Sequence, residues 1–277
     1  MARSYTMHDY TYDGSFDGLL TVLLEMYERK VQPNSIQPAE AVQGGLFTAT
    51  VPIQTNEEKA ARVWKGMLKY MDEGTRTKLY HVFLSERPDR EILICRFVQQ
   101  AVAARGRVDV SENYADDTVR LVHHISQQLG REKHRMEAFV RFEKTSEGLF
   151  HATIDPDFDV LPLIAPHFTK RYADQRWLIF DQRRRYGLYY DLVRTDIVEF
   201  ETEAPQHRSD VSATVLDERE PLFKALWQTY FDHANIPERK NLKLHRRHIP
   251  LRYWKYLSEK QPREQRFEPI KNKRSAL

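Results

Sequence analysis

The period of the hydrophobic pattern changes near Gly130, and this change constrains the fold more than any other feature of the sequence. Before it, apolar residues recur every three or four positions, as on the buried face of a helix. After it, they gather in short runs rich in β-branched and aromatic residues, which is typical of strands, and helical patterns return near the end. Because helices, strands and helices follow one another in blocks, the sequence predicts an α+β fold and not a doubly wound parallel sheet.

The first half of the chain is expected to be mainly helical. Residues 5–12 and 46–51 have strand-like composition, and residues 33–38 are expected to form a loop. Thr55 and Glu58 have the spacing of a capping box, in which each side chain accepts a hydrogen bond from a free backbone N–H of the other residue. The predicted helices cover residues 16–31, 56–71, 75–86, 89–105 and 112–130.

The second half is expected to carry most of the strands. Residues 139–142 and 149–154 flank Ser146-Glu147-Gly148, which is the pattern of a hairpin. The strands predict a mostly antiparallel sheet, made of a hairpin plus a meander, with an inserted helical segment and a helical, basic C-terminus. The other expected elements are a helix at 160–172, meander strands at 177–180, 186–192 and 197–200, and helices at 217–234 and 250–260.

The charge of the chain is unevenly distributed along it. Residues 237–277 hold 13 Lys and Arg against 4 Asp and Glu, whereas residues 1–236 hold 30 against 36. The net charge of +3 is therefore the sum of +9 and −6, and a basic end on an acidic body indicates a polyanionic or acidic partner. The polar segment 204–212 is typical of a linker. We therefore expect an α+β body over 1–204, with a helical segment at about 55–130, and a linker with a basic helical region over 205–277.

A single cysteine excludes several kinds of site. Cys95 lies in an apolar run, so a buried structural thiol is expected, and one thiolate cannot hold an iron–sulfur cluster. The sequence lacks Gly-x-Gly-x-x-Gly, Gly-x-x-x-x-Gly-Lys, Gly-x-Ser-x-Gly and His-Glu-x-x-His, and its histidines show no metal-ligand spacing. No signal peptide and no run of 18 apolar residues is visible, so a soluble, cytoplasmic setting without a membrane is expected.

Polar residues between 131 and 191 are the candidates for catalysis. Asp181 follows an apolar strand, where catalytic carboxylates are found, but Asp also favours the start of a turn. His167 could carry a proton or be a structural histidine within a helix. If the chain is an enzyme with acid–base or hydrolytic chemistry, these side chains should converge in one cleft. The candidate catalytic residues are His134, Arg141, His167, Arg171 and Asp181.

Two basic segments are candidates for binding nucleic acid. One is a run of three arginines after the first meander strand, and the other is a tail segment in which cations alternate with aromatic residues, so that phosphates and bases could both be contacted. The alternative is that Leu251, Trp254 and Leu257 dock the tail on the body, with the cations solvated. The candidate nucleic-acid-binding residues are Arg183, Arg184, Arg185, Arg246, Arg247, Arg252, Tyr253 and Lys255.

The sequence resembles an uncharacterised family known as probable DNA metabolism proteins, which share domain of unknown function 4130. The resemblance covers most of the chain in the expected order. Its residues are His134, residues 139–142, Ala152, Asp155-Pro156-Asp157, residues 161–168, Arg171, residues 177–181 and residues 250–259.

The resemblance implies a role in DNA repair or modification. Such proteins resemble companions of a radical S-adenosylmethionine protein, and some relatives are joined to a uracil-DNA-glycosylase-like domain. The chain lacks the Gly-Gln-Asp-Pro-Tyr motif of the glycosylases, so it resembles the companion, and any cluster would belong to the partner. We therefore expect a DNA-binding protein that acts with the radical S-adenosylmethionine protein; its own cofactor is unknown. The alternatives are an enzyme with a His/Arg/Asp pocket that acts on damaged nucleic acid, and a non-catalytic adaptor.

Overall fold

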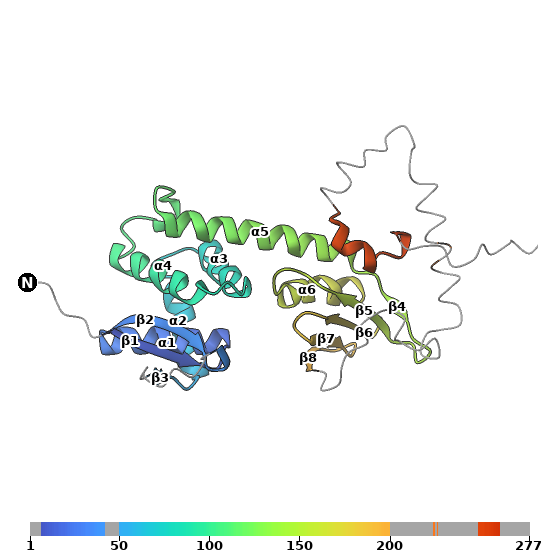
Figure 1. Cartoon of the computed structure of the whole chain (residues 1–277), viewed down its shortest axis with the longest axis horizontal. Helices are drawn as coiled ribbons and strands as arrows, with labels where there is room; N and C mark the ends of the chain where they lie inside the picture. Colours follow the sequence, from blue (N-terminus) through green and yellow to red (C-terminus); the bar gives the residue numbers. More distant parts are fainter. Residues whose placement is uncertain (1–6, 42–49, 200–223, 225, 227–248, 261–277) are drawn as a thin grey trace, which may run out of the picture. The chain divides into compact units, whose positions relative to one another are not determined.

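The computed structural model describes residues 7–41, 50–199, 224, 226 and 249–260, and the chain divides into two compact units, residues 1–131 and 132–277 (Figure 1). The division falls within helix α5, Asp117–Phe139. The expected boundary near residue 204 lies outside the described residues. Across the described ranges, no helix is long and apolar enough to cross a membrane.

Unit 1 contains a three-stranded parallel sheet, whereas the sequence predicted mostly antiparallel pairing. Strand β1, Met7–Tyr12, lies between β2, Gln32–Pro38, and β3, Thr50–Pro52, and is parallel to both. The prediction of a loop at 33–38 is therefore wrong. The two prolines of β2 lack the N–H that a hydrogen-bonded strand ladder needs, but β2 is an edge strand, where proline is tolerated. The register between β1 and β2 shifts next to Pro33.

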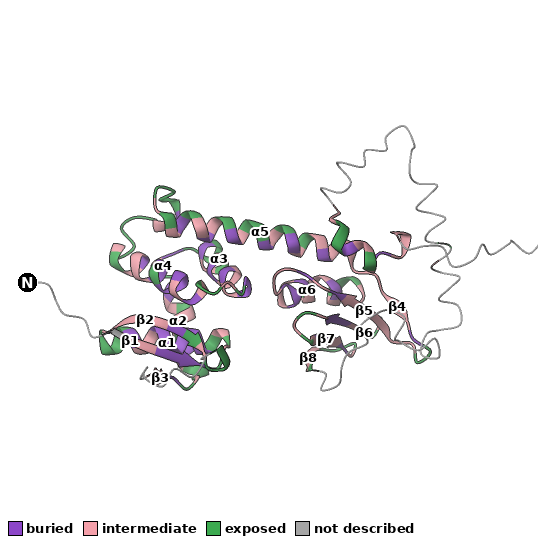
Figure 2. Cartoon of the chain, viewed as in Figure 1, coloured by how far each residue is buried: buried purple, intermediate pink, exposed green. Residues whose placement is uncertain are grey.

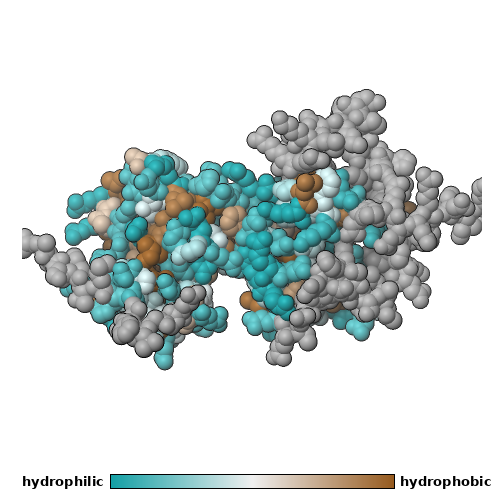
Figure 3. Space-filling view, in the orientation of Figure 1, coloured by the Kyte–Doolittle hydropathy of each residue, from teal (hydrophilic) through white to brown (hydrophobic). Residues whose placement is uncertain are grey.

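The helices of unit 1 lie close to their predicted positions and enclose one apolar core with the sheet (Figure 2). In Figure 3 hydrophobic residues also reach the surface of this unit as brown areas between hydrophilic ones. Short 3₁₀ turns follow β2 at Ala39–Ala41 and precede α5 at Val110–Glu112. The helices are α1 Phe16–Arg29, α2 Glu57–Met67, α3 Glu73–Leu84 and α4 Arg90–Ala104.

The start of α2 differs from the predicted capping box. Asn56, not Thr55, is the N-cap, and its side-chain oxygen accepts a hydrogen bond from the Lys59 N–H at 2.8 Å. The Thr55 hydroxyl instead donates to the Asp13 carboxylate at 2.7 Å. Asparagine and threonine can both cap a helix. Here the Thr55 side chain is hydrogen-bonded to Asp13, and Asn56 caps α2.

Helix α5 continues past Gly130, so the predicted end of the helix at residue 130 and the predicted strand at 139–142 are wrong. Buried positions recur along the helix on both sides of the glycine. A single helical glycine costs only about 1 kcal/mol relative to alanine, which packing of this stripe offsets. The stripe consists of Val119, Val122, Ile125, Leu129, Glu132 and Met136.

Unit 2 contains a five-stranded mixed sheet in the order β4-β5-β6-β7-β8. The β5–β6 pair is parallel, because helix α6, Leu161–Arg171, connects the two strands, and the other pairs are antiparallel. The predicted meander is confirmed. A hairpin also forms before it, but its first strand is Glu143–Lys144 and not the predicted 139–142. The strands are β4 Glu143–Lys144, β5 Phe150–Ile154, β6 Trp177–Asp181, β7 Tyr186–Tyr190 and β8 Thr195–Glu199.

An aromatic cluster holds α6 against this sheet. The Trp177 ring is fully buried and lies 6.2 Å from the Phe168 ring of α6 and 5.5 Å from the Tyr190 ring of β7. Large aromatic rings in such edge and stacked arrangements contribute strongly to a core. The sheet and α6 thus form a rigid base for the turns at the strand ends.

The C-terminal segment, residues 249–260, forms two 3₁₀ helices, Leu251–Tyr256 and Ser258–Lys260, in place of the predicted helix at 250–260. Leu257 has extended backbone and separates them. Leu257 is buried, as the docking alternative expected, but Leu251 is 57% exposed and Tyr253 is buried in its place. The predicted helix at 217–234 lies outside the described residues except for 224 and 226, which are helical.

Candidate functional site

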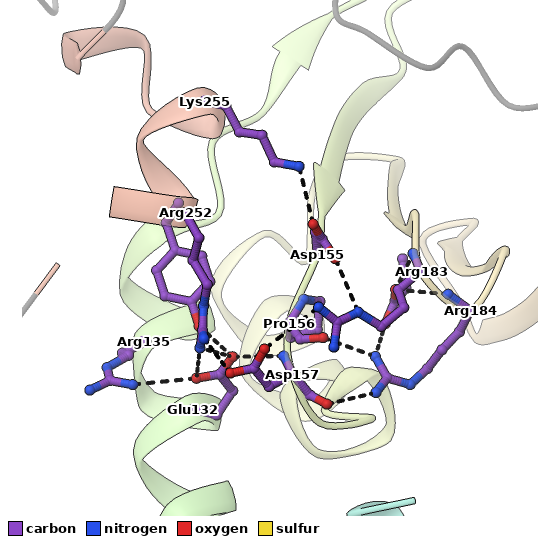
Figure 4. Close-up of polar contacts among 11 residues, drawn as sticks. Glu132, Arg135, Asp155, Pro156, Asp157, Arg183, Arg184, Arg252 and Lys255 are labelled. Atoms are coloured by element: carbon purple, nitrogen blue, oxygen red, sulfur yellow. Dashed lines mark hydrogen bonds and ion pairs between the residues drawn. The ribbon is translucent and has the colours of Figure 1, made fainter. Parts of the chain in front are cut away.

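Four of the predicted nucleic-acid-binding cations converge on the loop that follows β5 (Figure 4). Two come from the turn between β6 and β7, and two come from the C-terminal segment, some seventy residues later in the chain. Four carboxylates meet them, and all eight residues belong to unit 2. We call this set the ionic site: Glu132, Asp155, Asp157, Asp181, Arg183, Arg184, Arg252 and Lys255.

Asp181 holds the arginine turn in shape. Its carboxylate is fully buried and accepts hydrogen bonds from the N–H groups of Arg183 at 2.9 Å and Arg184 at 3.1 Å. The Arg184 guanidinium donates to it at 2.8 Å and also to the carbonyls of Pro156 and Asp157. Burial raises the pKa of Asp181, although Arg184 opposes the rise. The expected turn-opening role of Asp181 is thus confirmed.

The cations at the outer side of the ionic site pair with Asp155 and Asp157. Arg183 lies 3.3 Å from Asp155 and 3.6 Å from Asp157, and the Lys255 ammonium lies 3.1 Å from Asp155. Arg252 pairs with Asp157. The side chains of Arg183, Arg252 and Lys255 are 47%, 39% and 55% exposed, so these three charges remain accessible from solvent.

Glu132 is the buried anchor of the C-terminal segment. Its carboxylate accepts hydrogen bonds from the Asp157 N–H at 3.0 Å, from Arg252 at 3.1 Å and from the Tyr253 hydroxyl, and Arg135 lies 3.4 Å away. A buried charge is costly unless several donors satisfy it, as they do here. Sequence reasoning missed this residue, because the predicted helix ended at residue 130, whereas in the structure Glu132 lies on the buried stripe of α5.

Two tyrosines of the C-terminal segment, Tyr253 and Tyr256, help to hold the segment against unit 2. Tyr253 is only 2% exposed, with its ring beneath the Arg252 guanidinium and 6.3 Å from the Phe139 ring. Burial, and next the Glu132 hydrogen bond, raise the pKa of its hydroxyl. The Tyr256 hydroxyl donates to the Gln182 side chain at 2.9 Å. Stacking of a nucleic-acid base on Tyr253 would therefore require the segment to move.

The candidate catalytic residues have different surroundings. Arg141 lies beyond the end of α5, where its guanidinium donates to the carbonyls of Ala138 and Val140 and pairs with Glu259 at 3.0 Å. Arg141 therefore links Glu259, near the end of the C-terminal segment, to the last turn of α5. Asp181, as described above, is engaged by the arginine turn.

The other three candidates lie on helices or helix ends. His134 is exposed on α5, and the His167 ring lies edge-on to the Phe168 ring at 5.1 Å on α6. Arg171 is exposed and lies 5.8 Å from the centre of the Tyr172 ring. These surroundings differ from one residue to the next and add no support to the enzyme hypothesis, which stays a prediction.

The remaining predicted cations divide by position. Arg185 is exposed and ends the turn with a left-handed backbone, φ 59°. Arg246 and Arg247 lie outside the described residues. Within the part of the chain that the structure describes, no group of three or more His, Cys, Asp or Glu side chains is placed to hold a metal ion.

Comparison with known proteins places this site within a family. No curated protein matches the chain. A family model described as a domain of unknown function, DUF4130, matches residues 88–259, which is more than half of the chain. The match includes every residue of the ionic site and the Arg141–Glu259 pair. The chain therefore belongs to the family that carries the DUF4130 domain of unknown function.

Proposed function

We propose that the protein binds nucleic acid and acts in DNA repair or modification in the cytoplasm, as the companion of a radical S-adenosylmethionine protein. The observation that carries the nucleic-acid part is the convergence of Arg183, Arg184, Arg252 and Lys255 from two distant segments. Exposed cations on one surface are the electrostatic footprint of a phosphate-binding protein, and three of these four are exposed, each beside a carboxylate that a phosphate would have to replace.

The exposed cations of the ionic site are suited to exchanging partners. Arg183 and Lys255 share the carboxylate of Asp155, and such exposed pairs contribute only about 0–1 kcal/mol each. A backbone phosphate, which releases counterions on binding, is a stronger competitor for them. Arg184 is only 8% exposed and keeps the turn in place instead. The proposal thus assigns phosphate contact to Arg183, Arg185, Arg252 and Lys255.

The radical partner is supported by the family resemblance and by the single thiol. Cys95 is buried in α4, and burial raises the pKa of its thiol to about 12. A protonated, buried thiol is a poor metal ligand. The proposal therefore assigns cluster chemistry to the partner and DNA contact to this chain.

The test is binding of a fluorescently labelled DNA duplex to the full chain and to two double variants. R183Q/K255Q removes two exposed charges from the ionic site, and R176Q/R194Q removes two exposed arginines elsewhere in unit 2. Both lower the net charge by two. We expect R183Q/K255Q to weaken binding about tenfold and the control to change it by less than about twofold, because only the first loses phosphate contacts. Equal effects would contradict the proposed surface.

The partner is tested separately. We expect the radical S-adenosylmethionine protein to co-purify with this chain, and the pair to act on damaged DNA on which neither protein acts alone. Co-purification that survives high salt after nuclease treatment, with no DNA binding by the chain, would replace the proposal with the adaptor alternative. No co-purification would remove the companion role.

A further inference from the structure

Unit 1 contains a pocket of about 260 Å³ that the proposed DNA contact does not use. Helices α1, α2 and α4 supply its walls, and the residues that follow α2 complete it. Its lining is predominantly aliphatic and aromatic, as in small-molecule sites. The aliphatic and thioether side chains that form the walls are Leu23, Leu24, Val63, Met67, Val98 and Val102.

A glycine keeps one side of this pocket open. Gly66 lies on α2 and lines the pocket, and a Cβ atom added there would have no heavy atom within 4 Å. Glycine within a helix is unfavourable relative to alanine, and here no close packing requires it. The absence of a side chain at position 66 therefore has a local effect on the pocket: it leaves room.

The rim of the pocket is positively charged. Arg62 and Lys69 both line it and are exposed, and the only carboxylate paired with Arg62 among the described ion pairs is Glu28 at 3.2 Å. The backbone at Gly106 approaches the same rim, since a Cβ atom there would lie 3.2 Å from the Lys69 carbonyl. The flanking residues 105 and 107 are both exposed arginines.

We propose that this pocket binds a small amphipathic anion, with an apolar body inside and a carboxylate or phosphate at Arg62 and Lys69. The size fits such a ligand. An apolar cavity of about 150 Å³ holds one benzene ring, and the volume of this pocket, about 260 Å³, is a little less than twice that. The charged rim selects the anion, and the tyrosines Tyr27 and Tyr70 add polar groups to the lining.

Three naphthalene probes test the proposal on the full chain: 2-naphthoate, neutral 2-naphthol and the cation 2-naphthylmethylammonium. We expect calorimetry to show one saturable site for 2-naphthoate and at least tenfold weaker binding of the cation. K69E should weaken 2-naphthoate at least fivefold and leave 2-naphthol within twofold, because only the first probe carries a charge to the rim. Equal affinity for the anion and the cation would overturn the proposed selectivity.

Filling the pocket is the second arm. G66L should weaken 2-naphthoate at least tenfold, and G130L should leave it unchanged, because Gly130 is also a helical glycine with no heavy atom within 4 Å of an added Cβ but does not line the pocket. Thermal unfolding checks that both variants fold. If G66L does not fold, G66A replaces it, and we expect G66A to weaken 2-naphthoate by less than tenfold but measurably. Absent saturation, or wild-type affinity in a folded position-66 variant, would overturn the proposal.

Discussion

At the scale of single residues, the buried Glu132 anchors the C-terminal segment within unit 2. It occupies a core position of α5, yet its partners are Arg252 and Tyr253 of the C-terminal segment and the backbone of Asp157. One buried carboxylate thus joins three segments that are far apart in the sequence. The exposed cations Arg252 and Lys255 hold their positions because the segment that carries them is anchored there.

Removing this carboxylate should destabilise unit 2. We expect E132A to lower the free energy of unfolding by about 1–3 kcal/mol, because it leaves the buried Tyr253 hydroxyl and the Asp157 N–H without their acceptor. Hydrogen exchange of the amides in β5, β6 and β7 measures the change. The control is E28A, which removes a half-exposed pair with Arg62 in unit 1 and should cost less than about 1 kcal/mol there. Equal losses would contradict the anchoring role.

At the scale of elements, the C-terminal segment docks through residues that the helical spacing did not indicate. The pattern Leu251, Trp254 and Leu257 suggested one face of a helix, but in the two 3₁₀ helices the buried pair is Tyr253 and Leu257. The reason is chemical: the Tyr253 hydroxyl finds the Glu132 acceptor, which a leucine could not use. Hydrophobic spacing alone therefore predicts the docking and not its face.

This docking can be tested by two truncations of neighbouring side chains. Y253A should release the segment and raise the exchange rates of the amides of residues 251–257 by at least tenfold, because a ring and a hydrogen bond are lost together. L251A removes an exposed side chain and should leave those rates within about twofold. A larger effect of L251A would instead support the helical docking expected from the sequence.

Helix α3 offers a prediction on pH. Asp72 is its N-cap, and the hydrogen bonds from Thr75 hold the pKa of this carboxylate below its ordinary value. A depressed folded-state pKa gives stability that is present above about pH 4 and is lost as the pH falls through the folded value. Amide exchange in α3 should therefore accelerate on acidification, and D72N, which keeps a capping oxygen without the charge, should reduce this pH dependence. An unchanged dependence in D72N would show that Asp72 does not cause it.

At the scale of the whole molecule, the sequence predicted the order of elements better than their pairing. The α+β class, most helices and the meander follow from periodicity, which is a local property. The parallel sheet of unit 1 did not follow, because its strand β2 is marked by prolines and polar residues that usually indicate a loop. The extension of α5 past Gly130 depended on tertiary packing that no local signal contains.

The candidate site was predictable in its cations and not in its carboxylates. The run of three arginines after a predicted strand identified Arg183 and Arg184, and the alternation of cations with aromatic residues in the basic C-terminal region identified Arg252 and Lys255. Their convergence on Asp155 and Asp157 requires the fold of unit 2, which brings the turn after β6 to the loop after β5 through their parallel pairing. Glu132 lay beyond the predicted end of the helix at residue 130, and the other buried members of its stripe are apolar.

The salt dependence of DNA binding is the most direct test of phosphate contact at Arg183 and Lys255. The equilibrium constant for a labelled duplex is measured by fluorescence anisotropy between about 50 and 200 mM salt, for the full chain and for R183Q/K255Q. We predict a steep linear fall of log K with log salt concentration, and a slope that is shallower by about 2 in the variant, because two phosphate contacts no longer release counterions. Binding that does not respond to salt, or an unchanged slope in the variant, would show that these two residues do not contact phosphates.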